Sequence, residues 1–455
     1  MNTSLDSSVR VASNTHSELS RRLGLFDSAL LVIGSIIGSG IFLAPSNIAR
    51  MVHTVDGMLL VWVVGGVLSF CGALSYAELG AAFPKAGGIY VFLREAYGPL
   101  LAFLYGWCTF FVMQCGSIAT LASAFAIYLG YIVPLSPWVA KSFSIGCIAI
   151  LSVINCFGVR YGALVQNLLT IVKIGSLIGI SLVLFLSNKG SAGHFFMASA
   201  EGSRFSLSAF GIAMIAALWA YEGWHLLTFA AGEVKNPQRN LTWGLLLGTL
   251  ITIALYLLVN VAYLWMLPID TIAHSPRVAS EAMERSVGSV GGTIVALAIL
   301  ISITGATNSN VLAGPRVYFA MARQGLFFRQ VATVHPRYLV PVVSILLQGA
   351  WAIVLTLVGS FDRLFSYVIF VAWIFYALGG AAVFILRRRQ PDLERPYKVW
   401  GYPVVPLLFV LMASLIVLNT IFNDFKNSFW GLVVVFSGLF VYFYWSRKEA
   451  GKMKV

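Results

Sequence analysis

A single apolar stretch near the N-terminus, residues 24–50, is long enough to cross a bilayer, yet two glycines interrupt its centre. The interruption is Gly38-Ser39-Gly40, set between two β-branched isoleucines. Each glycine costs a helix about 1 kcal/mol relative to alanine. Unwound backbone in the hydrocarbon region is tolerated only where it lines a cavity or is covered by protein. The stretch therefore predicts a helix that breaks at mid-membrane and turns its freed amides and carbonyls toward a small polar ligand.

The composition is that of an integral membrane protein. Apolar residues make up 59% of the 455 residues and charged residues only 10%, whereas a soluble domain carries about 25% charged residues. The length suits about 12 helices of about 20 residues each, so we expect an all-α, polytopic membrane protein with twelve transmembrane helices. The spans are predicted at residues 24–50, 58–82, 99–128, 138–157, 160–187, 207–231, 240–266, 287–322, 341–359, 363–387, 403–424 and 428–446.

The positive charge of the chain follows this predicted topology. With the N-terminus inside, the predicted cytoplasmic segments hold most of the 30 lysines and arginines, including Arg387-Arg388-Arg389. Such a bias sets orientation in the membrane, so the net charge of +13 does not indicate nucleic-acid binding. We expect a multi-pass protein of the inner (cytoplasmic) membrane, with residues 1–23 and 447–455 as cytoplasmic tails and no cleavable signal peptide.

One lysine lies deep within a predicted span. Lys173 is about 20 Å from the inner end of the span 160–187 at 1.5 Å per residue, which is too far for its side chain to reach the interface. A lysine at mid-helix costs about 2.5–3.5 kcal/mol on insertion scales and is normally functional. A functional role and a buried structural hydrogen bond are the two interpretations of Lys173.

The sixth predicted span is also interrupted. Its centre reads LWAYEGWH and brings a carboxylate, Glu222, together with a glycine and three aromatic residues. Ordinary packing is an alternative role for Trp219 and Trp224, but packing does not explain a carboxylate at this depth. Glu222 and His225 are three residues apart and can interact if the segment stays helical.

The two interrupted spans predict an internal repeat. They stand five helices apart and run in opposite directions, which is the pattern of an inverted five-plus-five repeat whose discontinuous helices build a site at mid-membrane. The repeats are residues 24–187 and 207–387. Gly34 and Gly38, four residues apart, are also typical of a helix-packing face, but the second break favours ligand binding. An outer loop (188–206), a cytoplasmic loop (388–402) and two further helices (403–446) complete the chain.

Several ordered motifs resemble a known family. Over residues 24–446 the chain resembles the amino acid–polyamine–organocation superfamily, and within it the L-amino-acid transporter branch, which includes bacterial serine/threonine-type exchangers and the light subunits of heteromeric transporters. The resemblance implies the leucine-transporter fold and alternating access. The motifs are IIGSGIF, AELGAAFPKAGGIYVFLREAYG, WAYEGW, GEVKNPQRN, GPRVYFAMARQG and RPYKVWGYP.

The resemblance also implies roles for residues at both breaks. Amides around Ser39 and Gly40 would hold a substrate α-carboxylate, and carbonyls near Ile36 and around the second break would hold the α-ammonium. Trp219 falls on the family's aromatic gate, and Lys173 falls where sodium-coupled relatives bind an ion. The candidate substrate-binding residues at the breaks are Ile36, Ile37, Gly38, Ser39, Gly40, Trp219, Ala220, Glu222 and Gly223.

The chemistry of the breaks agrees with these roles. A half-helix N-terminus presents free N–H groups and a partial positive charge to a carboxylate, and unwound carbonyls accept hydrogen bonds from an ammonium. Side-chain specificity then falls to other helices, where Gln114 and Asn308 are candidates. No cofactor or metal site is expected.

Glu222 departs from the glycine that many relatives with neutral substrates have at this position. Its carboxylate has three possible roles. The first is recognition of cationic amino acids or amines. The second is to carry a proton, and the third is to bond to His225 or Lys173 as part of the structure.

The expected function is sodium-independent exchange of L-amino acids, most simply small neutral ones. The alternatives are a proton-coupled symporter, a cationic amino acid or polyamine permease that uses Glu222, and a sensor that binds amino acids without moving them. An enzyme is not expected, because the sequence holds no nucleophile–base pair, metal cluster or phosphate loop. All five cysteines lie in apolar spans and none in the outer loop 129–138, so no disulfide-linked heavy subunit is expected.

Overall fold

The computed structural model describes residues 19–196, 206–358, 361–423 and 425–452. Every regular element in these ranges is a helix, and the only β-type contact is an isolated parallel bridge between Leu23 and Val234. The predicted all-α class is therefore confirmed for the described residues. The α-helices are α1 Leu25–Ile36, α2 Gly40–Val52, α3 Val55–Ala82, α4 Ile89–Tyr97, α5 Pro99–Cys108, α6 Cys115–Ile132, α7 Pro137–Cys156, α8 Val159–Leu186, α9 Leu207–Ala220, α10 Leu226–Phe229, α11 Pro237–Met266, α12 Ile269–His274, α13 Val278–Val287, α14 Ser289–Ala313, α15 Pro315–Arg323, α16 Val342–Val358, α17 Phe361–Arg389, α18 Val404–Asn423 and α19 Phe425–Lys452.

The helices make the chain a polytopic membrane protein. Within the described ranges, nine helices are long and apolar enough to cross a membrane, and α1 with α2 forms a tenth span if this pair, bent by 45°, is one crossing. Two further apolar helices, α9 and α16, are shorter. A π-helical turn, η1 Thr109–Gln114, joins α5 and α6 into one long span. Three 3₁₀ turns complete the elements: η2 Ala192–Phe196, η3 Ala231–Glu233 and η4 Arg329–Ala332.

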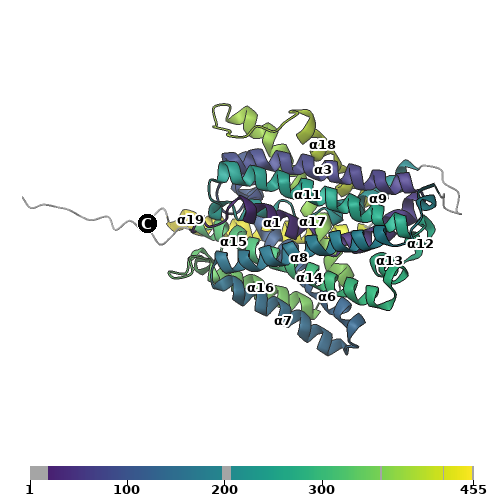
Figure 1. Ribbon diagram of the computed structural model, residues 1–455. Helices are drawn as coiled ribbons and strands as arrows, with labels where there is room; N and C mark the ends of the chain where they lie inside the picture. The colour runs from purple at the N-terminus through teal and green to yellow at the C-terminus, as the bar shows by residue number, and fades with distance from the viewer. Residues whose placement is uncertain (1–18, 197–205, 359–360, 424, 453–455) are drawn as a thin grey trace, which may run out of the picture.

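The long helices lie side by side in one bundle (Figure 1). The C-terminal end of α19 and the helix α15 lie at one end of the bundle, at the left in Figure 1, and the short helices α12 and α13 lie at the opposite end. The predicted spans leave residues 83–98 and 267–286 outside any helix, whereas α4, α12 and most of α13 form there. The predicted span 287–322 matches one apolar span, Ser289–Arg323, in which α14 and α15 meet at Pro315 because proline cannot continue the backbone hydrogen-bond ladder.

A buried ion pair joins separate segments at the α15 end. The guanidinium of Arg316 donates to both carboxylate oxygens of Glu233, at 2.6 and 2.9 Å, and the two side chains are 1% and 0% exposed. The backbone carbonyl of Glu233 accepts hydrogen bonds from the amides of Arg22 and Leu23. The pair therefore ties α15 to the loop before α11 and to the segment that leads into α1.

A second carboxylate fixes the loop that follows α17. Glu78, buried near the end of α3, accepts two hydrogen bonds from Arg387 at 2.9 and 2.6 Å and one from the backbone amide of Val399 at 2.7 Å. Arg395 lies 3.5 Å from the same carboxylate. Arg389 donates to a backbone carbonyl of α4. Two of the three arginines in the run 387–389 are therefore used in packing.

Glu233→Gln tests the buried pair at the α15 end. The substitution leaves a guanidinium buried without its counter-charge, which costs about 3–5 kcal/mol. We expect a large fall in the midpoint of thermal unfolding of the detergent-purified protein, followed by tryptophan fluorescence. Glu394→Gln is the matched control, because Glu394 is exposed. Equal midpoints for the two variants would contradict the role of the pair.

Candidate functional site

The first predicted interruption is confirmed. Helix α1 ends at Ile36 and α2 begins at Gly40, and the two axes differ by 45°. Ile37 has φ −71° and ψ 93°, which is extended rather than helical backbone. The first amides of α2 have no acceptor within their own helix, so this turn presents N–H groups at a helix N-terminus.

The second interruption lies in the sixth predicted span. Helix α9 ends at Ala220, the chain turns through residues 221–225, and the short helix α10 begins at Leu226. Gly223 has φ +117°, a conformation that residues with a Cβ rarely adopt. The glycine in this motif is therefore required by the backbone of the turn.

The two breaks contact each other directly. A Cβ on Gly40 would lie 2.7 Å from the Cα of Ala220, and a Cβ on Gly223 would lie 2.8 Å from the carbonyl oxygen of Ser35. The hydroxyl of Ser35 donates to the carbonyl of Gly223 at 3.0 Å. Glycine at both positions lets the two unwound segments approach to backbone contact.

Gly34 has a different role from the glycines at the breaks. A Cβ on Gly34 would overlap the side chains of Gln166 and Thr170 of α8. Gly34 is therefore a helix-packing glycine, whereas Gly38 lines the cavity described below. The helix-packing role considered for Gly34 and Gly38 therefore applies to Gly34 and not to Gly38.

Lys173 of α8 is bonded to the first break. Its ammonium donates to the carbonyl of Gly34 at 2.7 Å and to that of Ile37 at 2.6 Å, and the residue is 1% exposed. Lys173 does not line the cavity. Its charge is placed against two backbone carbonyls at the end of α1, where it stabilises the unwound turn.

Two hydroxyls that sequence analysis did not single out also bond to the breaks. Tyr256 of α11 lies 3.0 Å from the carbonyls of both Ile36 and Ala220, one on each break. Ser302 of α14 donates to the carbonyls of Ile37 and Gly38, at 3.1 and 3.0 Å. Neither residue has a local sequence signal, because a tyrosine or serine in an apolar span is common.

A cavity of about 80 Å³ lies between the breaks. Seven of the predicted residues line it: Ile36, Gly38, Ser39, Gly40, Trp219, Ala220 and Glu222. Ile37 and Gly223 are buried in the breaks but do not line it. The other lining residues are Ser35, Ser117, Thr120, Leu121, Ala306, Asn310, Ala372 and Trp373.

The structure places Gln114 and Asn308 outside the cavity lining. Asn308 donates to Gln166 at 3.0 Å and accepts from Asn155 at 2.8 Å, so it joins α14 to α7 and α8. Asn310 lines the cavity instead, because two residues along a helix turn the side chain by about 200°. Gln114 donates to the side chain of Asn310 at 2.6 Å and so contacts the lining from behind.

Ser117, Thr120 and Leu121 bring one face of α6 to the cavity. They lie at positions i, i+3 and i+4, which share one face of a helix. Two hydroxyl residues at that spacing in an apolar span are a signal that sequence analysis did not use. Trp373 and Ala372 come from α17. No pattern of polar residues in the sequence of α17 indicated that this helix lines the cavity.

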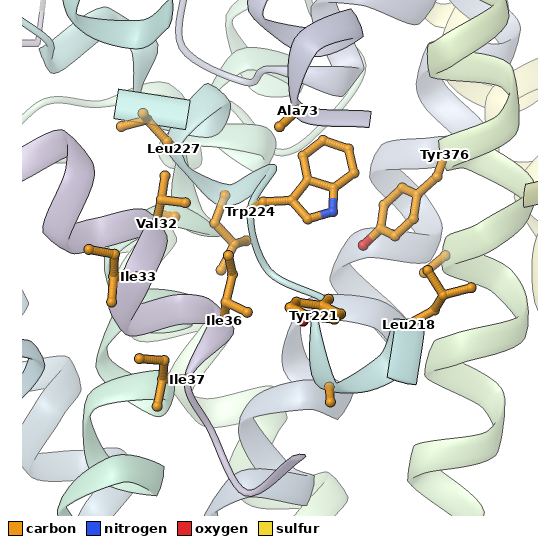
Figure 2. Close-up of a cluster of buried hydrophobic side chains, with 14 of the residues drawn as sticks. Val32, Ile33, Ile36, Ile37, Ala73, Leu218, Tyr221, Trp224, Leu227 and Tyr376 are labelled. Carbon is orange, nitrogen blue, oxygen red and sulfur yellow. The ribbon is translucent and has the colours of Figure 1, made fainter. Parts of the chain in front are cut away.

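Glu222 is held by a neighbour on α17. The hydroxyl of Tyr376 donates to Oε1 of Glu222 at 2.7 Å and lies 3.2 Å from Nε2 of His225. Nδ1 of His225 lies 3.7 Å from the same carboxylate oxygen. Figure 2 shows the Tyr376 hydroxyl pointing toward the second break, beside the indole of Trp224. The Glu222 side chain is 35% exposed and lines the cavity, whereas Lys173 bonds to carbonyls of the first break.

Sequence comparisons find a family model and several relatives that match most of the chain. A family model described as amino acid permease matches residues 23–441. The chain is 34% identical over 435 residues to the serine/threonine exchanger SteT of Bacillus subtilis (strain 168), covering 95% of this chain and 98% of the relative. It is 32% identical to the human b(0,+)-type amino acid transporter 1, covering 95% and 89%. It is 28% identical to the human cystine/glutamate transporter, covering 95% and 87%.

Gly40→Ala tests the contact between the breaks, and Gly223→Ala tests that contact together with the positive φ of the second turn. Each added methyl meets backbone within 3 Å, and such overpacking costs about 1–3 kcal/mol. We expect both variants to unfold at lower temperature than the parent in detergent. Gly211→Ala in α9 is the matched control, because a Cβ there meets no atom within 4 Å. If all three variants unfold alike, the breaks are not in contact.

Proposed function

Because this chain belongs to the amino acid permease family, we propose that it moves small neutral L-amino acids across the membrane by exchange that does not require sodium. The chain is a transporter and not an enzyme, as its relatives are amino acid transporters and exchangers. The single observation that carries the proposal is the cavity between two unwound segments, lined by Ser39 and Gly40 of one break and Ala220 and Glu222 of the other.

The groups that line the cavity suit a zwitterion. The amides at the start of α2, around Ser39 and Gly40, would hold the α-carboxylate, since a helix N-terminus has free donors and a partial positive charge. The carbonyls of Ile36, Trp219 and nearby residues would accept from the α-ammonium. Trp219, which lines the cavity, would close it as a gate. Both charged ends of the ligand are then bound by backbone, which accounts for the need for two breaks.

The size and polarity of the cavity support a small substrate. A volume of about 80 Å³ holds on the order of half a dozen waters, or a molecule with a similar number of non-hydrogen atoms. The side chains around it include the hydroxyls of Ser117 and Thr120 and the amide of Asn310. Small amino acids with a short apolar or hydroxyl side chain fit this description best.

Twelve crossings in a leucine-transporter arrangement are part of the proposal. The count follows if α1 with α2, α9 with α10, and the shorter helix α16 are each one crossing. Residues 24–187 and 207–387 are then the two inverted repeats, with one break in the first helix of each. The N- and C-terminal ends and the α15 end of the bundle face the cytoplasm in this arrangement, in the inner membrane.

Lys173 supports sodium independence. Its ammonium lies within hydrogen-bond distance of the carbonyls of Gly34 and Ile37, and backbone carbonyls are also the groups that unwound helices offer to a coupling cation. An ammonium at this place would occupy the position of a bound sodium ion.

The chain is proposed to work without a covalently attached partner. Its five cysteines lie in α3, α5, α6 and α7, and three of them, Cys71, Cys108 and Cys115, are buried. In this proposal none of them forms a disulfide with a glycoprotein subunit.

Counterflow in proteoliposomes tests exchange. We expect labelled serine and alanine to enter vesicles preloaded with unlabelled serine, alanine or threonine, and not empty vesicles. Entry should be unchanged when choline replaces sodium. Entry into empty vesicles that follows a pH gradient would favour proton symport. Entry of arginine or putrescine alone would favour a cationic permease, and binding without entry would favour a sensor.

Glu222→Gln separates the three roles of the carboxylate. Glutamine still accepts a hydrogen bond from Tyr376, and a neutral acceptor in place of a charged one costs about 1 kcal/mol. We expect exchange of alanine to fall by no more than about fivefold, with unchanged dependence on pH. Selective loss of arginine entry would assign Glu222 to cation recognition. Loss of a pH-driven component for both substrates would assign it to proton transfer.

A further inference from the structure

A second cavity lies at the α15 end of the bundle, apart from the substrate cavity. Its volume is about 410 Å³, and the two cavities share no lining residue. Five chain segments meet around it: the residues before α1, the turn between α3 and α4, α4, η3 and α15. The lining residues include Arg21, Lys85, Arg94, Glu95, Gly232 and Arg323. This cavity is called the basic pocket below.

The charge of the basic pocket is strongly unbalanced. Four cations, Arg21, Lys85, Arg94 and Arg323, line it with one carboxylate, Glu95. Arg21, Lys85 and Arg94 are exposed, and none of the three forms an ion pair with another residue in the part of the chain that the structure describes. Like charges that converge from separate segments repel one another, so an anion between them relieves this repulsion.

The pocket suits a phosphate group better than the transported substrate. A zwitterion has one charge of each sign, whereas this lining has a large excess of positive charge. Guanidinium groups bind phosphate oxygens in bidentate fashion, and a lysine ammonium adds a point charge. The volume lies within the range of about 300–1,000 Å³ that is typical of small-molecule sites. We propose that the basic pocket binds a phosphate-bearing anion, either a soluble phosphate or a lipid headgroup.

The position of the pocket gives the ligand a regulatory effect. The segments that line it are already joined: Leu23 forms a backbone bridge with Val234, and the amide of Gly87 donates to the carbonyl of Phe229. A ligand that contacts the residues before α1, α4 and α15 together stabilises this joined arrangement over any other. Because alternating access requires these segments to part, bound phosphate slows exchange. This second step rests on the proposed function, whereas binding itself does not.

The double variant Lys85→Gln/Arg94→Gln tests binding on the full chain in detergent. Inorganic pyrophosphate is the soluble probe, short-chain phosphatidic acid is the lipid probe, and succinate at matched ionic strength is the carboxylate control. Binding is measured by isothermal titration and by the shift in thermal unfolding. The double variant Arg337→Gln/Lys398→Gln is the matched control, since it removes two exposed cations that do not line the pocket.

We expect at least one phosphate probe to bind the parent and the control variant, and to bind Lys85→Gln/Arg94→Gln about tenfold more weakly. The probe that binds identifies the source, soluble or lipid. Equal affinity for both double variants, binding of succinate as tight as that of phosphate, or no binding of either probe would overturn the proposal. The melting midpoint without ligand checks that each variant is folded.

Exchange of serine in proteoliposomes, with the binding probe on the pocket side, measures the regulatory step. We expect the probe to slow exchange by the parent and not by Lys85→Gln/Arg94→Gln. Intact exchange without phosphate binding would overturn the site and leave the proposed function standing. Phosphate binding in a chain that exchanges no amino acid would support the site and overturn the proposed function.

Discussion

The hydrocarbon core of a membrane offers no water to an unpaired peptide group, and this constraint governs the centre of the molecule. Inside the predicted spans 24–50 and 207–231, the chain leaves helical geometry at residues 37–39 and 221–225. The carbonyls released at the breaks accept hydrogen bonds from Lys173 of α8, Ser302 of α14 and Tyr256 of α11. Three surrounding helices are thereby joined to the two unwound segments, so the breaks are held by the bundle around them.

The same constraint links stability to transport. Hydrogen bonds from fixed side chains hold the shape of the cavity. In the proposed function, the free amides and the unused lone pairs of the carbonyls at the breaks bind the amino acid. Gly40 and Gly223 allow the breaks to touch, so one small ligand would reach both in the proposed function. At the α15 end, buried carboxylates such as Glu233 join loops to helices. If the proposed transport proceeds by alternating access, contacts of this second kind would break while those at the breaks are kept.

Much of this arrangement could be predicted from the sequence because its signals are local. The positions of the long apolar helices, both interruptions and the depth of Lys173 follow from the order of residues along single spans. The sequence did not reveal which side of α14 faces the cavity. Asn308 and Asn310 are both polar residues in one apolar helix, and only the packing of α14 against α7 and α8 turns Asn308 away from the cavity. The loops that fold into α4, α12 and α13 also depend on contacts with distant segments.

By itself, the sequence determined that the chain is helical, that it lies in a membrane and that two of its spans break, because glycine content, hydropathy and charge act within a few residues. Only the tertiary structure decided which groups meet at those breaks. Tyr376 donates a hydrogen bond to Glu222 although the two residues are 154 positions apart in the chain. Tyr256 joins the carbonyls of Ile36 and Ala220. Such pairings depend on how whole helices are rotated and placed against one another, which no single span encodes.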